Sequence, residues 1–459
     1  MKAKLADITR DHMREYDIPG VALAVVRDGE IVHEDGVGLA SVAGEAPAGQ
    51  RTAWPICSLT KSMTCTAVMQ LAEQGLIDID QPVSTYLPAW RVKDPDAGPQ
   101  ITVKMLMHHG SGLGRVGFQD RVRQEPVNPY PTRESLMEAI TGADLQSEPG
   151  RFWAYSNEGF ATLGHIVEKI SGIRLEEYFL TKVFEPLGMT DTRVHLADWR
   201  AASDRTVNYI REELGEKADG APHGKYQPGF LPEDYQTYLS TGGIVSTAHD
   251  LALYQAAAMN YDGSPVLGRD ALEQMQNTAF EYGDTNWGYG FGWSVFWSGD
   301  TRVVGHAGGM VGLNTFSLFV PDEQIGAVVV TNRSEAGAFE LAEKLLGEVR
   351  GTPLWRDSTR KPLPFETNYA APTDESPSAF DGDYAHGDVV TRIAGIDGGI
   401  NLKLIRNGVE VFEDVATRVG PESFLSRNAA QIMQFNRDED GQGATLFEAG
   451  LLWQRVSGS

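Results

Sequence analysis

Ser58 and Lys61 lie three residues apart in a segment, 58–75, whose composition predicts a helix. Residues three apart share one face of a helix, so the Lys61 amine is expected beside the Ser58 hydroxyl. A serine hydroxyl is a weak nucleophile and needs a nearby base or cation to act. At the start of the helix, the Ser58 amide could also bind an oxyanion. The alternative is an ordinary helix-capping serine beside a solvated lysine. The spacing recurs at Ser358 and Lys361, but in a Pro-rich stretch with no helical pattern.

The second candidate is Tyr155-Ser156-Asn157, the only Tyr-x-Asn in the chain, in a polar turn just before a predicted helix. A lysine ammonium nearby would favour the phenolate of Tyr155, which could then act as a general base toward Ser58 or the leaving group. Asn157 has both a donor and an acceptor for a substrate amide. The alternative is a simple turn with no chemical role.

The third candidate is His306, within Gly305-His306-Ala307-Gly308-Gly309, between two strand-like runs. Glycines allow a ligand to approach the backbone closely, and the Gly309 N–H could complete an oxyanion hole with the Ser58 N–H. The alternative is a hydrogen-bonded structural histidine. A competing match, His108-His109-Gly110, lies in a turn.

These candidates have to be positioned by a mixture of helices and strands. Asp28-Gly29 predicts the turn of a hairpin. After Gly351 the chain becomes rich in Pro and charge, as linkers are, and then shows short strands with frequent turns. The sequence predicts three parts, namely a domain at 1–355, a linker at 356–377 and a small antiparallel β-barrel at 378–459. Within the first part, the expected helices are 3–16, 58–75, 156–173, 247–259 and 334–350, and the expected strands are 21–26, 31–38, 301–309, 313–321 and 325–332.

In their order along the chain, Ser58-x-x-Lys61, Tyr155-x-Asn157 and His306-x-Gly308 resemble the motifs of the penicillin-recognising serine hydrolases. That family includes class C β-lactamases, D-alanyl-D-alanine carboxypeptidases, D-aminopeptidases and β-lactamase-fold esterases. Segments such as ITVKMLMHHGSGL and STGGIVSTAHDLALY add to a resemblance that covers about residues 3–350. It implies an α+β fold, with an antiparallel sheet flanked by helices, an all-helical region, and the site between them.

The resemblance also implies a role for each candidate residue. Ser58 would be the acylated nucleophile, and Lys61 and Tyr155 would share proton transfer. Asn157 would hold the substrate amide, and the amides of Ser58 and Gly309 would form the oxyanion hole. His306 would be catalytic where some relatives carry a lysine that attracts a substrate carboxylate. No metal and no cofactor are required.

Histidine is mostly neutral at pH 7, which disfavours a carboxylate-bearing substrate. The members of the resembled family that carry His-x-Gly lean toward D-aminopeptidases, amidases and esterases. The expected function is therefore hydrolysis of small amides or short peptides with D-residues, through an acyl-enzyme. The alternative function is that of a carboxylesterase or a β-lactam hydrolase with the same catalytic residues. A third hypothesis is a non-catalytic binding protein. The tail resembles a lipocalin-like barrel, which could support a homo-oligomer.

The acidic composition of the chain excludes some classes of binding partner. The chain has 63 acidic and 39 basic residues, a net charge of -24, so nucleic acid and anionic membranes are poor partners. Two cysteines, Cys57 and Cys65, exclude a disulfide framework. There is no long apolar run, and the N-terminal residues lack the apolar core of a signal peptide, so a cytoplasmic protein is expected.

Residues 114–133 are expected to form a loop beside the site. Trp287, Tyr289 and Trp293 are expected to pack rather than line a pocket.

Overall fold

The structure is a computed structural model that describes most of the chain. The described residues are 1–113, 132–143, 145, 148–150, 153–211, 226–228, 239–281, 287–298, 300–310, 312–333, 336–354, 376–386, 389–406, 409–418, 423–426, 432–437, 443–448 and 451–456. The predicted loop at 114–133 lies outside them except for its last two residues. Only the last two residues of the predicted linker, 376 and 377, are described.

A nine-stranded sheet forms the centre of the molecule, with every neighbouring pair antiparallel and the strand order β3-β2-β1-β13-β12-β11-β10-β9-β8. The predicted hairpin joins β1 to β2, and Asp28 and Gly29 both have positive φ as its turn requires. The strands are β1 (Gly20–Arg27), β2 (Glu30–Ser41), β3 (Ala46–Pro47), β8 (Phe280–Glu281), β9 (Trp287–Tyr289), β10 (Ser294–Ser298), β11 (Thr301–Met310), β12 (Leu313–Val320) and β13 (Ile325–Thr331).

Both faces of this sheet are buried, and strand β1 shows how the sequence achieves it. Side chains alternate between the two faces of a strand. Val21, Leu23 and Val25 pack in one hydrophobic cluster, whereas Ala22 and Ala24 belong to a second cluster on the opposite face. A run of apolar residues without polar alternation is what a strand covered on both faces needs.

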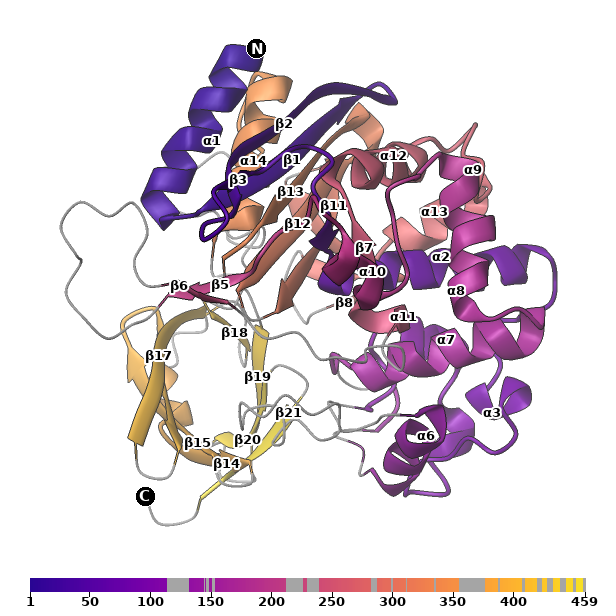
Figure 1. Ribbon diagram of the computed structural model, residues 1–459. Coiled ribbons are helices and arrows are strands. Elements are labelled where there is room, and N and C mark those ends of the chain that lie inside the picture. The colour runs from indigo at the N-terminus through magenta and orange to yellow at the C-terminus, as the bar shows by residue number, and fades with distance from the viewer. Residues whose placement is uncertain are drawn as a thin grey trace.

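Helices α1 (Lys2–Tyr16) and α14 (Ala338–Arg350) cover one face, and α12 (Ala248–Met259) packs on the other, beside the helical region (Figure 1). The predicted helices at 3–16, 156–173, 247–259 and 334–350 are present, although the last begins at Ala338. The remaining α-helices are α2 (Thr60–Glu73), α3 (Val83–Tyr86), α4 (Val103–Met107), α6 (Arg133–Gly142), α7 (Asn157–Ser171), α8 (Leu175–Tyr178), α9 (Glu185–Leu187), α10 (Leu196–Ala201), α11 (Leu239–Gly242) and α13 (Arg269–Gln276).

Short elements complete this part of the chain. Two small antiparallel pairs, β4 with β7 and β5 with β6, connect its segments. The short strands are β4 (Trp54–Pro55), β5 (Tyr209–Arg211), β6 (Tyr226–Pro228) and β7 (Val245–Ser246), and the short helical turns are η1 (Cys57–Leu59), η2 (Gly98–Gln100), η3 (Phe179–Phe184), η5 (Pro321–Glu323) and η6 (Pro377–Phe380).

The C-terminal residues form a separate antiparallel sheet in which each strand pairs with the next and β21 pairs back with β14 (Figure 1). Its buried core contains an aromatic cluster, in which Phe435 contacts the rings of Phe380, Phe424 and Tyr384. Its strands are β14 (Gly382–His386), β15 (Val389–Ile396), β16 (Gly399–Arg406), β17 (Val409–Arg418), β18 (Ser423–Ser426), β19 (Ile432–Arg437), β20 (Gly443–Glu448) and β21 (Leu451–Arg455).

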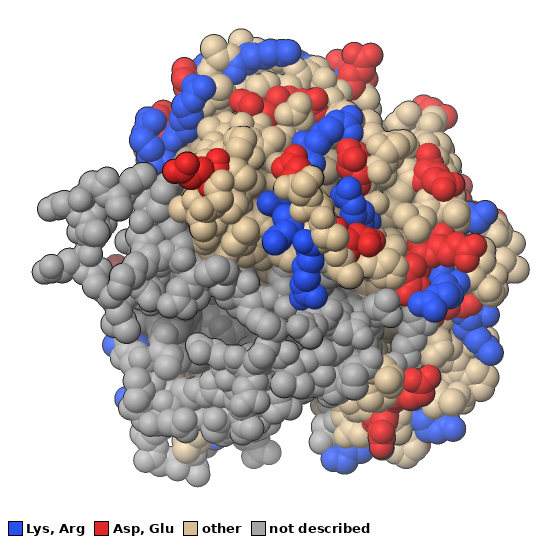
Figure 2. Space-filling view, viewed as in Figure 1, with Lys and Arg blue, Asp and Glu red and all other residues tan. Residues whose placement is uncertain are grey.

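The predicted combination of antiparallel sheet and helices is therefore confirmed. Basic and acidic side chains are interspersed over the described part of the face in Figure 2. None of the helices among the described residues is both long and apolar enough to span a membrane.

Candidate active site

Ser58 lies in a tight turn that precedes the long buried helix α2. The turn, η1, is a 3-10 helix, and the α-helix itself begins at Thr60 rather than at Ser58 as expected. Cys57 has φ 51°, a left-handed backbone conformation that is strained for a residue with a side chain. A hydrogen bond from the Ile56 amide to the Ile244 carbonyl ties the segment before the turn to the segment that follows α11. The nucleophile candidate therefore sits on a strained turn that its surroundings hold in place.

Lys61 is fully buried, one helical turn after Ser58. Its ammonium donates to Ser58 Oγ at 3.1 Å, to Asn157 Oδ1 at 2.8 Å and to the Thr241 carbonyl at 2.9 Å. A lysine ammonium has three protons and no acceptor, so these three acceptors match the charged form. The expected contact between the Lys61 amine and the Ser58 hydroxyl is present.

Tyr155 reaches Ser58 from the start of helix α7. Its hydroxyl donates to Ser58 Oγ at 2.8 Å, and its ring centroid lies 4.8 Å from Lys61 Nζ. Ser156 caps the helix by accepting a hydrogen bond from the Gly159 amide, which makes Asn157 the first helical residue. The cap fixes the direction of the chain, so Tyr155 and Asn157 both reach the Ser58–Lys61 pair. Four of the six predicted site residues thus form one hydrogen-bonded cluster.

The other two predicted site residues, His306 and Gly309, lie in strand β11, which packs against the turn that contains Ser58. Among the described residues, β10 pairs with β11 only as far as Gly305, so β10 does not cover the stretch from His306 to Met310. On its other edge, β11 stays paired with β12 up to Met310. Gly308 faces the turn, because a Cβ built on it would lie 2.3 Å from the Ile56 carbonyl and 3.3 Å from Cys57 Cβ.

This packing yields a test of the two neighbouring glycines. Gly308→Ala should lower the free energy of unfolding by about 1–3 kcal/mol or more, because the added methyl overlaps Ile56 and Thr315. Gly309→Ala should change it by less than about 0.5 kcal/mol, since the nearest atom to its Cβ is the Leu313 carbonyl at 3.8 Å. Denaturant unfolding of both variants measures this difference. Equal stability of the two variants would contradict the close packing of β11 on the Ser58 turn.

His306 is buried, and both of its ring nitrogens are engaged away from Ser58. The Ala307 carbonyl, 2.6 Å from Nδ1, can only accept, so Nδ1 carries the proton. Nε2 therefore accepts from the Tyr289 hydroxyl at 2.7 Å. Burial, assisted by the charge of Lys61, lowers the pKa of His306 to about 3. The imidazole is neutral, and its hydrogen bonds join β11 to β9.

The depressed pKa of His306 predicts a pH-dependent loss of stability. Its unfolded pKa near 6.5 exceeds the folded value of about 3, so His306 favours folding above pH 6.5, and this contribution is lost as the pH falls toward 3. Between pH 7 and pH 5 the loss should be about 2 kcal/mol. In His306→Gln, the difference in unfolding free energy between pH 7 and pH 5 should shrink by that amount. Between pH 8 and pH 9, the two curves should run parallel. An unchanged pH dependence would contradict this assignment.

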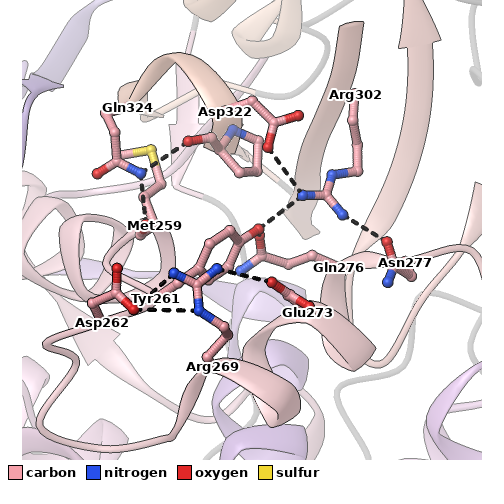
Figure 3. Close-up of polar contacts among 11 residues, drawn as sticks. Met259, Tyr261, Asp262, Arg269, Glu273, Gln276, Asn277, Arg302, Asp322 and Gln324 are labelled. Atoms are coloured by element: carbon pink, nitrogen blue, oxygen red, sulfur yellow. Dashed lines mark hydrogen bonds and ion pairs between the residues drawn. The ribbon is translucent and has the colours of Figure 1, made fainter. Parts of the chain in front are cut away.

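The beginning of β11 is fixed by a polar network around Arg302 (Figure 3). The Arg302 guanidinium is nearly buried and donates to Asn277 Oδ1 at 2.6 Å and to the Tyr261 hydroxyl at 2.9 Å, with Asp322 at 3.4 Å. Tyr261 in turn donates to Gln276 at 2.8 Å. The network links β11 to the ends of α12 and α13, and so fixes the strand that carries His306 and Gly309.

Sequence reasoning missed three residues that the fold brings to this cluster. Thr241 contributes only its carbonyl oxygen, which gives no side-chain signal. Tyr289 was expected to pack, and it is buried as expected, but it also donates to His306. His109, part of the competing His-His-Gly match, lies against the Tyr155 ring with centroids 4.4 Å apart. Among the described residues, no group of His, Cys, Asp or Glu side chains could hold a metal ion.

The family is established by a match to the family model described as Beta-lactamase, which covers residues 5–350. The chain therefore belongs to the beta-lactamase family, whose members are serine hydrolases. Penicillin-binding protein 4 of Amycolatopsis lactamdurans is 27% identical over 352 residues, which cover 74% of this chain and 88% of that protein. Protein flp of Staphylococcus aureus (strain NCTC 8325 / PS 47) is 25% identical over 342 residues, which cover 74% of this chain. The chain spans only 64% of the length of Protein flp.

Solved structures show the same fold at low sequence identity. The octameric penicillin-binding protein homologue from Pyrococcus abyssi has a TM-score of 0.69 and 22% identity, and the match covers 97% of this chain and 98% of that one. SurE has a TM-score of 0.71 and 22% identity, with 99% of each chain covered, and it has also been solved with D-Leu. A class C beta-lactamase has a TM-score of 0.63 and 20% identity over 75% of this chain and 95% of that one.

Proposed function

We propose that this protein hydrolyses small amides or short peptides containing D-residues through an acyl-enzyme on Ser58. One observation carries the proposal: Ser58 Oγ lies within hydrogen-bonding distance of both Lys61 Nζ, at 3.1 Å, and the Tyr155 hydroxyl, at 2.8 Å. A serine held by an amine and a phenol has both a partner that can take its proton and a cation that stabilises the resulting charge. An ordinary helix-capping serine needs neither contact.

The proposed reaction has two matched halves. The pair acts in the form that has lost one proton, with a Tyr155 phenolate beside the Lys61 ammonium. Ser58 gives its proton to this phenolate while Oγ bonds to the substrate carbonyl carbon. The pair returns the proton to the leaving amine as the C–N bond breaks, which leaves an ester on Ser58. Water then attacks the ester, its proton follows the same route, and the acid is released as Ser58 regains its proton. Sharing protons through one positioned pair is typical of general acid–base catalysis.

Two further groups are proposed to bind the substrate. Asn157 Oδ1 accepts from Lys61, so its NH₂ group is directed elsewhere and can donate to a substrate amide oxygen. The amides of Ser58 and Gly309 are proposed as the oxyanion hole, which is supported by the close packing of β11 on the Ser58 turn. One such donor is typically worth about 10²–10³ in rate. His306 is proposed to support the site as a neutral hydrogen-bonding group between Tyr289 and Ala307.

The choice of substrate class rests on charge. A neutral His306 offers no fixed cation to a substrate carboxylate, which favours amides, amino-end peptides and esters over substrates with a carboxylate beside the reacting bond. A D-residue is supported by SurE, a structural neighbour that has been solved with D-Leu. The alternative is a carboxylesterase or a β-lactam hydrolase on the same residues, which is supported by the class C beta-lactamase fold and by Penicillin-binding protein 4.

We also propose that residues 378–459 form a lipocalin-like barrel domain, joined through the linker to the hydrolase domain at 1–355, and that this domain supports a homo-oligomer. The octameric homologue from Pyrococcus abyssi, which matches nearly the whole chain, supports an oligomer. Multi-angle light scattering of the full chain and of a chain ending at residue 355 tests this role. We expect several chains per particle for the full chain and fewer for the truncated chain. The same number of chains per particle in both would contradict this role.

A substrate panel tests the proposed activity. D-alanyl and L-alanyl p-nitroanilides, p-nitrophenyl acetate and a chromogenic cephalosporin should be compared by kcat/KM, each against Ser58→Ala as the background. We expect the D-alanyl anilide to exceed the L-alanyl anilide by tenfold or more, and the cephalosporin to be poor. Preference for the L-anilide, or rapid hydrolysis of the cephalosporin, would contradict the proposed substrate. Rapid turnover of the ester alone would favour the carboxylesterase.

A further inference from the structure

His109 lies in the turn that follows helix α4 and is fully buried. Its backbone has φ 61°, in the left-handed region that few residues with large side chains occupy. Asn or Gly would occupy this conformation at lower cost. A strained, buried histidine at such a position indicates that its side chain or backbone makes contacts that compensate for the strain.

The contacts of His109 involve the two backbone amides on either side of Tyr155. The Ala154 amide donates to the His109 carbonyl at 2.7 Å, and the Ser156 amide donates to His109 Nδ1 at 3.1 Å. One residue therefore holds the chain immediately before and immediately after the tyrosine. Because Nδ1 accepts from a backbone N–H, it carries no proton in this arrangement.

The imidazole ring also fixes the Tyr155 side chain. The ring centroids of His109 and Tyr155 are 4.4 Å apart, and the histidine ring also contacts Tyr289 at 4.8 Å and Phe160 at 4.9 Å. Tyr289 is the residue that donates to His306. His109 therefore packs against the Tyr155 ring and against β9, the strand whose Tyr289 donates to His306.

A second backbone bond strengthens this attachment. The Gly150 amide donates to the Gly110 carbonyl at 2.7 Å, so the segment before Tyr155 is tied to the same turn at a further point. Tyr155 itself lies outside regular structure, just before α7, and needs such ties to hold its hydroxyl 2.8 Å from Ser58 Oγ. A displacement of about 1 Å at a reacting group can lower a rate by roughly 10²-fold.

We propose that His109 is a positioning residue, which holds the Tyr155 hydroxyl on Ser58 through its Nδ1 and carbonyl bonds and its ring contact. The inference rests on the proposed role of Tyr155 in proton transfer. His109 does not touch the substrate, so removal of its side chain should slow the covalent step without weakening binding.

The test uses a fluorophosphonate, which phosphonylates a reactive serine, and separates its maximal labelling rate from its binding constant. His109→Leu, which removes the acceptor at similar size, should lower the maximal rate about 10–100-fold and change the binding constant less than twofold. His109→Asn should recover most of the rate, because its Oδ1 replaces Nδ1 and Asn tolerates positive φ. The matched control is His108→Leu, one residue earlier and also buried, which should label like the wild type.

The Tyr155→Phe background distinguishes positioning of the hydroxyl from general loosening of the site. There, adding His109→Leu should cost less than twofold, because no hydroxyl remains to be positioned. The inference is overturned if His109→Leu labels at the wild-type rate, if His108→Leu slows labelling equally, or if the loss is as large in the Tyr155→Phe background. If Tyr155→Phe alone labels like the wild type, the proposed role of Tyr155 in proton transfer fails, and the inference about His109 fails with it. Should His109→Leu not fold, His109→Gly takes its place, since it removes the acceptor and relieves the backbone strain.

Discussion

Replacement of Ser58 by alanine is expected to lower kcat by about 10⁵–10⁶-fold, the largest effect of any single substitution in this chain. The hydroxyl is the only oxygen that both Lys61 Nζ and the Tyr155 hydroxyl contact at 3.1 Å and 2.8 Å among the described contacts of the cluster. Removal of a nucleophile that acts with its base as one unit abolishes nearly all of the catalytic advantage. Substrate binding should change little, so KM should remain within a few-fold of the wild-type value.

Ser62 provides a matched control in α2, the helix that directly follows the Ser58 turn. It is buried one turn further on, and its hydroxyl donates to the Leu59 carbonyl at 2.8 Å rather than contacting Lys61. Ser62→Ala should keep kcat within about threefold, with a stability loss of roughly 1 kcal/mol for one hydrogen bond. Steady-state kinetics on the best substrate of the panel measures both variants. A Ser58→Ala enzyme within tenfold of the wild type would contradict the account.

The second large effect is expected for Lys61 and Tyr155 together. Tyr155→Phe and Lys61→Met should each lower kcat by about 10³–10⁴-fold. The kcat of the double variant should be only slightly below that of the less active single variant. Methionine is chosen because it keeps the volume of the fully buried lysine side chain, although the Thr241 carbonyl and Asn157 Oδ1 lose their donor. Both groups contact one oxygen, so they should act as a single proton-transfer unit.

A double-mutant cycle on kcat measures this coupling, with thermal unfolding of each variant as the check that the fold survives. Losses that multiply fully in the double variant would show that Lys61 and Tyr155 act independently. That result would remove the shared proton pathway from the proposed mechanism, while leaving Ser58 as the nucleophile.

The parts of the site that sequence could predict are those set by local geometry. The Ser58–Lys61 contact follows from the period of a helical turn, and the position of Asn157 at the start of α7 follows from the capping residue Ser156. The hairpin of β1 and β2 follows from Asp28-Gly29. Each of these depends on residues that are close in the chain.

The parts that could not be predicted depend on contacts between distant segments. Thr241 accepts from Lys61 through its backbone carbonyl, which any residue would supply, so no residue type marks the position. The left-handed backbone of Cys57 and of His109 is atypical for these residue types and is held by the surrounding fold. Strand β1 lies beside β13, some 300 residues later, and nothing local to either strand specifies this pairing.

The measurement that tests the central claim most directly is the mass and location of a covalent adduct. The wild-type chain should take up one fluorophosphonate, and the adduct should map to Ser58 in the peptide that spans η1 and the start of α2. Ser58→Ala should take up none under the same conditions, whereas Ser62→Ala should label fully. An adduct on another residue, or labelling of Ser58→Ala at the wild-type rate, would contradict the assignment of Ser58 as the nucleophile.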